Sequence, residues 1–252
     1  IQTVCPALAG YTVFLHRMQG VRMDRYSRNM EMLTLEENIS LRSKKIAVIG
    51  CGGLGGYIIE MLARLGVGTL AVADGDVFEE SNLNRQLISD TGVIGKNKAL
   101  QAKIRISTIN PDTDVIAYDR NLTSENAREI LSGCDIAMDA LDGVESRLVL
   151  QQACEDMGIP MVHGAISGWY GQVSTIFPGE RTLSIIYSGF EDRKTDNRLG
   201  NPSFTPALTA SLQVSEALKI MISRGSLLRG RIMFINTYDN SVDIAELSKR
   251  QI

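Results

Sequence analysis

The chain has 252 residues, with 26 Lys and Arg against 29 Asp and Glu, a formal net charge of −3 and a hydrophobic fraction of 44%. This balance argues against a nucleic-acid-binding protein, which is usually basic, and no apolar run approaches the length that spans a bilayer. One large α/β domain fits the length and the core-forming content, and no repeat or linker divides the chain.

The first 22 residues differ in composition from those that follow. They lack the basic start of a secretory signal, and a regular pattern begins only at Met23. We therefore expect an extension of uncertain role at residues 1–22 and a single domain over residues 23–252.

A strand–helix–strand unit follows two stretches of helical composition, at 23–33 and 34–45. Residues 45–50 form an apolar run that is typical of a buried parallel strand. Residues 56–66 carry apolar side chains at helical spacing, and residues 69–74 give a second strand. This unit has roughly the thirty residues expected of a mononucleotide-binding unit.

Strands and helices continue to alternate. The sequence predicts helices at 96–110, 124–133 (capped by Ser124), 144–158 and 206–223, strands at 113–119, 134–140, 159–166 and 171–178, and a final hairpin over 230–247. This order predicts an α/β fold with a Rossmann-like, mostly parallel sheet, helices on both faces, an N-terminal helical arm and a C-terminal β-hairpin region. The long polar segment 185–204 is expected to be a functional or mobile loop.

A glycine motif lies between the first strand and its helix. Gly50, Gly52 and Gly55, with Gly53 among them, form G-x-G-x-x-G. Glycine permits the tight turn and lets backbone amides approach phosphate oxygens, while the helix N-terminus favours an anion. The motif in this context predicts a nucleotide site.

An acidic pair follows the second strand. Asp74 comes 22 residues after Gly52, which suits a carboxylate that accepts hydrogen bonds from ribose hydroxyls. Asp76 is expected either to serve the same nucleotide or only to cap the turn.

Polar residues further along select between nucleotides. Because ligands bind outside the carboxyl ends of strands in open α/β sheets, we expect these residues to converge with the glycine loop. They are Asn82, Arg85, Gln86, Lys98, Asp139 and Asp142. Lys and Arg can neutralise phosphate oxygens and Asp can hold a hard cation, so the set predicts ATP with Mg²⁺, whereas a hydride-transfer cofactor needs less positive charge.

The ordered set of motifs resembles the ubiquitin-activating-enzyme-like adenylyltransferases, the family of the bacterial MoeB, ThiF and HesA proteins. The resemblance runs from "RYSRN" at residue 25 to about residue 250, through "GCGGLG", "ADGDVFEESNLNRQ", "IGKNKA", "MDALDG" with a following Arg, and "HGAISGWYGQV". It implies ATP-dependent adenylation of the C-terminal Gly-Gly carboxylate of a small ubiquitin-like (β-grasp) sulfur-carrier protein, with release of pyrophosphate.

The resemblance also implies roles for individual residues. Asp74 would hold the ribose, and the glycine loop, with Asp76, Asn82 and Gln86, would hold the nucleotide. Four residues would act in catalysis: Arg85 and Lys98 on the phosphates, Asp142 on Mg²⁺, and Arg28 from the partner subunit of a homodimer. A separate sulfurtransferase is a further expected partner.

The four cysteines, Cys5, Cys51, Cys134 and Cys154, include no Cys-x-x-Cys pair. We therefore expect no zinc site, although many relatives have one, and a reducing cytoplasm suits this cysteine usage. Segment 185–204 has no cysteine, which leaves a covalent carrier intermediate in doubt.

Two further residues lie near the expected site in the sequence. Gly143 stands where relatives usually have Asn, next to the expected metal ligand. His163, near the end of a strand, is expected to support the site without taking part in the chemistry.

Two other functions remain open at this point. The glycine motif and Asp74 alone would also fit an NAD-dependent oxidoreductase, which leaves Arg85, Lys98 and Asp142 unexplained. A non-catalytic carrier- or peptide-binding module of the same fold is the second alternative.

Overall fold

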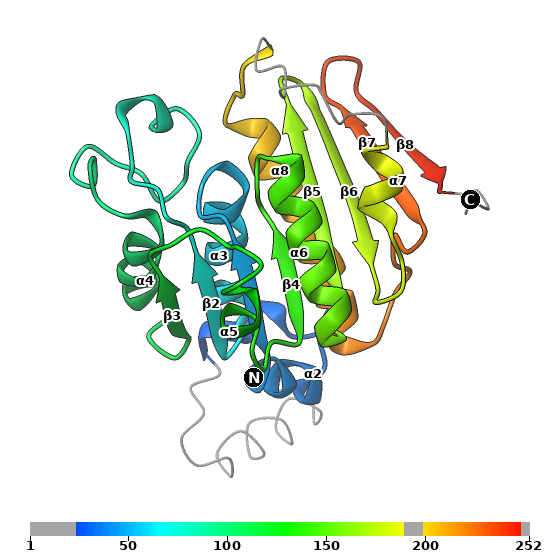
Figure 1. Cartoon of the computed structure of the whole chain (residues 1–252). Coiled ribbons are helices and arrows are strands. Elements are labelled where there is room, and N and C mark those ends of the chain that lie inside the picture. Colours follow the sequence, from blue (N-terminus) through cyan, green and yellow to red (C-terminus); the bar gives the residue numbers. More distant parts are fainter. Residues whose placement is uncertain (1–23, 189–198, 248–252) are drawn as a thin grey trace.

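The computed structural model describes residues 24–188 and 199–247; the expected extension at 1–22 and the middle of segment 185–204 lie outside this part. One sheet of eight strands runs through it in the order β3-β2-β1-β4-β5-β6-β7-β8 (Figure 1). The strands are β1 Lys45–Ile49, β2 Thr69–Ala73, β3 Asp114–Tyr118, β4 Ile136–Asp139, β5 Met161–Ser167, β6 Tyr170–Ile176, β7 Arg231–Asn236 and β8 Ser241–Glu246.

The sheet is parallel from β3 to β5 and antiparallel from β5 to β8. Short turns join the antiparallel pairs β5–β6 and β7–β8, whereas the parallel pairs need longer crossovers, and β6 and β7 pair antiparallel across a connection that contains α7 and α8. Strands β7 and β8 are the predicted C-terminal hairpin. The α/β fold class predicted from the sequence is confirmed.

Helices cover both faces of this sheet (Figure 1). The longer ones are α3 Gly53–Leu65, α4 Lys98–Ile109, α6 Val144–Met157 and α8 Phe204–Ile222. The shorter ones are α2 Leu35–Leu41, α5 Ala127–Ile130, α7 Thr182–Ile186 and the 3₁₀ helices η1 Asp24–Asn29 and η2 Glu80–Asn82. Among the described residues, no helix has the length and apolar character needed to cross a membrane.

The core forms two layers because successive side chains of a strand point to opposite faces. In β1, Ile46 and Val48 belong to the cluster that contains α3, α4 and α8. Ala47 and Ile49 belong to the cluster on the other face, which contains α5, α6 and α7. All four are fully buried, so the sequence of β1 is apolar throughout instead of alternating.

Two local predictions need correction. The helical stretch predicted at 23–33 is only the 3₁₀ helix η1, which ends at Asn29. Helix α5 begins at Ala127 with Asn126 at the N-cap position, so Ser124 lies too early to cap it, and the Ser124 hydroxyl donates to Glu125. The first residue outside α5 is Asn126, whose Oδ1 accepts from the amide of Thr123, so this turn precedes the helix.

Candidate functional site

The glycine loop closes tightly onto the carboxyl end of β4. Gly50 has a φ of +94°, and a Cβ there would lie 2.5 Å from the carbonyl oxygen of Ala140. A Cβ on Gly55 would lie 1.9 Å from the carbonyl oxygen of Gly50. Only glycine fits both positions, and the loop thereby delivers the chain directly into α3, which begins at Gly53.

The N-terminus of α3 has no side-chain cap. Gly52 occupies the N-cap position without a side chain that could accept from the first amides, which a helix leaves without intrahelical partners. Gln86 lies beside Gly52, since a Cβ on Gly52 would be 3.5 Å from Gln86 Nε2. Gln86 is buried, and its Oε1 has no hydrogen-bond partner in the described part of the chain. Such an atom indicates a missing partner.

Asp74 ties the end of β2 to the glycine loop. Its carboxylate accepts hydrogen bonds from the amide of Cys51 at 2.7 Å and from that of Asp76 at 2.9 Å. Burial raises the pKa of Asp74, although both hydrogen bonds oppose the rise. Each carboxylate oxygen retains acceptor capacity beyond these bonds, so the group can still receive donors from a ligand.

Lys98 is the first residue of α4, and this position places it near the carboxyl ends of the parallel strands. Its side chain is only 9% exposed, and Nζ lies 3.2 Å from Oδ2 of Asp76, whose side chain is 66% exposed. Asn97 holds this position, because its side chain caps α4 through the amide of Leu100 and donates to the carbonyl of Asp74 at 2.9 Å. Asn97 was not among the predicted site residues, although Asn at the start of a predicted helix is a typical N-cap signal.

The segment between β2 and α4 supplies Arg85 and Asn82. Arg85 Nη1 donates to the carbonyl of Ser81 at 3.0 Å and to Asn84 Oδ1 at 2.9 Å, and its Nε would lie 4.0 Å from a Cβ on Gly53. Asn82 is buried, and its Oδ1 accepts from the amide of Glu79. The side chain of Asn82 therefore shapes the turn that presents Arg85.

The two carboxylates at the end of β4 and just beyond it have different surroundings. Asp142 is exposed and makes no hydrogen bond or ion pair with the residues that the structure describes. Asp139 is fully buried and engages Leu141, His163 and the guanidinium of Arg147. The expectation that both carboxylates converge on a cation is therefore wrong for Asp139.

A buried polar network extends inward from Asp139. His163 Nδ1 lies 2.7 Å from Asp139 Oδ2, and Gln172 Nε2 lies 3.1 Å from His163 Nε2. Because a carboxylate only accepts and an amide NH₂ only donates, we assign the neutral imidazole with its proton on Nδ1. Burial lowers the pKa of His163, against the raising effect of Asp139. His163 thus supports Asp139 from within the core.

The lowered pKa of His163 predicts a pH effect on stability. The unfolded chain protonates His163 near its ordinary pKa of 6.5 while the folded chain still keeps it neutral, so stability falls as the pH drops below that value. We expect the free energy of unfolding to fall by up to about 1 kcal/mol more in wild type than in His163→Gln between pH 7.5 and 5.5. Denaturant unfolding at the two pH values measures this, and equal pH dependence would contradict it.

Arg28 lies at the other end of α3 from the glycine loop. Its 3₁₀ helix η1 contacts the C-terminal end of α3, where a Cβ on Gly66 would lie 2.8 Å from the ring of Tyr26. A helix of 13 residues is about 20 Å long. Within one chain, the structure therefore does not bring Arg28 to the residues described above.

The cysteines of the described part are buried. Burial raises the pKa of Cys51 well above its ordinary value, that of Cys134 to about 11 and that of Cys154 to about 12. Because the thiolate is the reactive form, these three side chains are poor nucleophiles at neutral pH. Cys5 lies outside the described residues.

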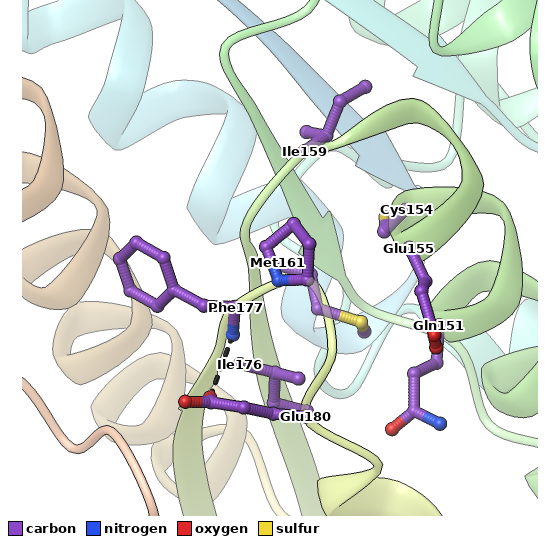
Figure 2. A pocket seen from close by; sticks show the side chains of 9 residues that line it. Gln151, Cys154, Glu155, Ile159, Met161, Ile176, Phe177 and Glu180 are labelled. Carbon is purple, nitrogen blue, oxygen red and sulfur yellow. Dashed lines mark hydrogen bonds between the residues drawn. The ribbon is translucent and has the colours of Figure 1, made fainter.

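Figure 2 shows a pocket at a different place, between the C-terminal part of α6, the start of β5 and the end of β6. Cys154, Met161, Ile176 and Phe177 are among its lining residues, and its volume is about 10 Å³. That volume is close to the minimum for one water molecule. The pocket is therefore too small for a nucleotide. It lies at the amino end of β5, whereas Gly50 lies at the carboxyl end of the parallel strand β1.

No group of three or more His, Cys, Asp or Glu side chains in residues 24–188 and 199–247 is arranged to hold a metal ion. A metal bound at Asp142 would therefore need ligands from elsewhere. Mg²⁺ commonly meets this condition, because it binds through one or two carboxylates together with substrate phosphates and waters. The chemistry of the donor set fits Mg²⁺ that arrives with a nucleotide.

Comparison with known proteins gives a consistent result. Residues 26–251 match the model of the ThiF family. The "SAMP-activating enzyme E1" of Haloferax volcanii is 34% identical, covering 88% of this chain and 84% of that protein. The "Sulfur carrier protein adenylyltransferase" of Thermus thermophilus is 33% identical, covering 87% and 85%. The crystal structure of PaaA shares the fold at 19% identity, with a TM-score of 0.77, and covers 96% of this chain and 92% of that chain.

Proposed function

The chain belongs to the ThiF family, and we propose that it uses ATP to adenylate the C-terminal Gly-Gly carboxylate of a small ubiquitin-like sulfur carrier, releasing pyrophosphate. It is an adenylyltransferase, since its relatives over most of the chain are named as adenylyltransferases or as an activating enzyme. Their names refer to SAMP and to a sulfur carrier, which supports a carrier protein as substrate. Residues 23–252 would act as one adenylation domain.

One observation carries the proposal. The carboxyl ends of the parallel strands bring together the glycine loop, with the uncapped first amides of α3, and the cation of Lys98. Oriented amides and cations of this kind fit a polyphosphate. The buried Gln86 Oε1, which lacks a partner in the described part of the chain, would accept from a hydroxyl or amino group of the nucleotide. Asp74, directly after β2, would accept hydrogen bonds from a ribose.

The chemistry follows from the charges. The carrier carboxylate is ionised at neutral pH, so its oxygen can attack the α-phosphorus of ATP without a general base. The new bond joins the carboxylate oxygen to the α-phosphorus, and the bond between the α-phosphorus and the bridging oxygen breaks, so that the electron pair leaves with pyrophosphate. Lys98 and Arg85 would neutralise charge on the phosphates. Mg²⁺ held by Asp142 and phosphate oxygens would supply further neutralisation.

The ion pair with Asp76 would prepare Lys98 for this task. The side chain of Lys98 is mostly buried, whereas that of Asp76 is largely exposed. Their ion pair keeps the ammonium group of Lys98 close to the surface of the site. A phosphate oxygen can replace or join the Asp76 carboxylate as the partner of Nζ. The ammonium would then need little reorganisation when the phosphates bind, which is what electrostatic catalysis requires.

The direct test is exchange of labelled pyrophosphate into ATP in the presence of small β-grasp proteins that end in Gly-Gly. We expect exchange with at least one such carrier and none with the same carrier lacking its last two residues. Hydride transfer with NAD and no exchange with any carrier would instead support the oxidoreductase alternative.

We further propose a homodimer in which each site receives Arg28 from the other chain, because Arg28 lies beyond the far end of α3 from its own glycine loop. Arg28→Ala and Lys98→Ala should each be inactive. When the two variants are co-expressed, random pairing in a symmetric dimer gives one intact site in each heterodimer, about a quarter of wild-type activity.

The same experiment tests the other arrangement. If each chain used its own Arg28, both sites of the heterodimer would lack one residue and no activity would return. A monomer in light scattering at the assay concentration would also contradict the proposal.

A further inference from the structure

Leu141, the residue before Asp142, is held at both its amide and its carbonyl. The amide of Leu141 donates to Asp139 Oδ1 at 3.0 Å. The carbonyl of Leu141, which belongs to the Leu141–Asp142 peptide, accepts from Arg147 Nη2 at 2.5 Å. The direction in which the Cα–Cβ bond of Asp142 leaves the chain depends on this peptide plane.

Arg147 is itself fixed at several points. It lies in the second turn of α6 and is 5% exposed. Nη1 donates to the hydroxyl of Tyr187 at 2.7 Å, and Nε lies 3.7 Å from Asp139 Oδ2. The planar guanidinium presents these donors in a fixed geometry. A single buried side chain therefore links the loop that bears Asp142 to α7 and to the strand end of β4.

On the other side of Asp142 the chain is held by a backbone bond alone, in which the carbonyl of Gly143 accepts from the amide of Arg147 at 3.2 Å. Gly143 is the N-cap residue of α6 and has no side chain that could bond to the helix. A Cβ added to Gly143 would have Ser146 Oγ as its nearest neighbour, at 3.7 Å, so no surrounding atom packs tightly against this residue. Glycine also has the widest conformational range of any residue. The orientation of Asp142 therefore depends on the anchor at Leu141.

We propose that Arg147 is a positioning residue that fixes the Leu141–Asp142 peptide and thereby directs the Asp142 carboxylate toward Mg²⁺ bound with ATP. This inference rests on the proposed function, since it takes Asp142 as the metal ligand. Arg147 would act through Asp142 and would not touch the substrate. Residues that hold a metal ligand in this way often change metal affinity by about 10- to 100-fold when they are replaced.

Arg147→Lys is the variant that tests this role. Lysine keeps a positive charge beside buried Asp139 but cannot present the same planar set of donors to Leu141 and Tyr187. Gln151→Ala is the matched control, because Gln151 lies on α6 one turn later, is also buried, and accepts from the amide of Leu183 in α7. It therefore perturbs the same helix without touching the loop of Asp142.

The measurement is the dissociation constant of ATP by calorimetry, once with Mg²⁺ and once with EDTA. Wild type should bind ATP more tightly with Mg²⁺, and Asp142→Asn should lose this gain. In Arg147→Lys the dissociation constant of ATP with Mg²⁺ should be about tenfold higher than in wild type. Its dissociation constant in EDTA should stay at the wild-type value. Gln151→Ala should keep the full gain, whatever it does to the melting temperature.

The outcomes separate the two hypotheses. A folded Arg147→Lys protein with the full Mg²⁺ gain, next to an Asp142→Asn protein without it, overturns the positioning role alone. Wild type that binds no ATP overturns the proposed function. Asp142→Asn with the full gain overturns the metal role of Asp142, and with it the inference, without contradicting adenylation by this chain. Crystal structures of the two α6 variants check the structural step: a Leu141–Asp142 peptide displaced only in Arg147→Lys supports the inference, and an unmoved peptide overturns it.

Discussion

Replacing Asp142 by Ala is expected to lower the rate of carrier-dependent adenylate formation by more than about a hundredfold. The proposed Mg²⁺ at this position neutralises charge that builds up on the phosphates, and the loss of several kcal/mol of such stabilisation has an effect of this size. The fold should be unaffected, because Asp142 is exposed and bonds to no residue in the described part of the chain. Pyrophosphate exchange at saturating ATP measures the loss.

Glu145→Gln is the control for the Asp142 variant. Glu145 is also exposed and acidic, and it lies in the first turn of α6, three residues further along. Its replacement removes the same charge from nearly the same place, so a general field effect would appear in both variants. Equal activity of the Asp142 and Glu145 variants would remove Asp142 from the proposed metal site.

Replacing Lys98 by Met is expected to lower the same rate by about a hundredfold or more, because a preorganised cation at the phosphates is lost. Met has a similar unbranched stem and fills the space of the buried side chain. The remaining partner, Asp76, is largely exposed and can be hydrated. Loss of the ion pair should therefore lower the free energy of unfolding by about 1 kcal/mol or less.

Lys103→Met serves as the matched control for Lys98. Lys103 lies on α4 but is exposed, away from the start of the helix. Its replacement changes the net charge by the same amount and should leave the exchange rate within about twofold of wild type, since exposed charges are screened by salt. Comparable losses in both variants would show that the effect comes from the overall charge and not from a contact of Lys98.

Several features of the site were determined by the sequence itself. The G-x-G-x-x-G motif between an apolar strand and a helix predicts a tight turn that only glycine allows. The structure agrees, because a Cβ at Gly50 or Gly55 would collide with backbone oxygens. The position of Asp74 directly after β2, and of Lys98 at the start of α4, followed from the alternation of strands and helices. Parallel strands place their carboxyl ends at one edge, so these residues were predicted to lie together.

The direction of each side chain was decided only by the tertiary structure. Asp139 and Asp142 are three residues apart at the carboxyl end of an apolar strand, yet one is fully buried and the other is exposed. The difference arises because Asp139 still belongs to β4 and faces His163 and Arg147, which come from β5 and α6. Local periodicity contains no information on those partners.

Contacts between residues distant in sequence also required the fold. Asn97 reaches the carbonyl of Asp74, and Arg147 reaches both Leu141 and Tyr187, while Arg28 is kept at the far end of α3. The sequence determined which chemical groups this protein has and at which edge of the sheet most of them lie. Only the packing of α4, α6 and α7 on that sheet decided which groups face a ligand and which hold the others in place, because burial and hydrogen bonding depend on segments that the local pattern does not relate to one another.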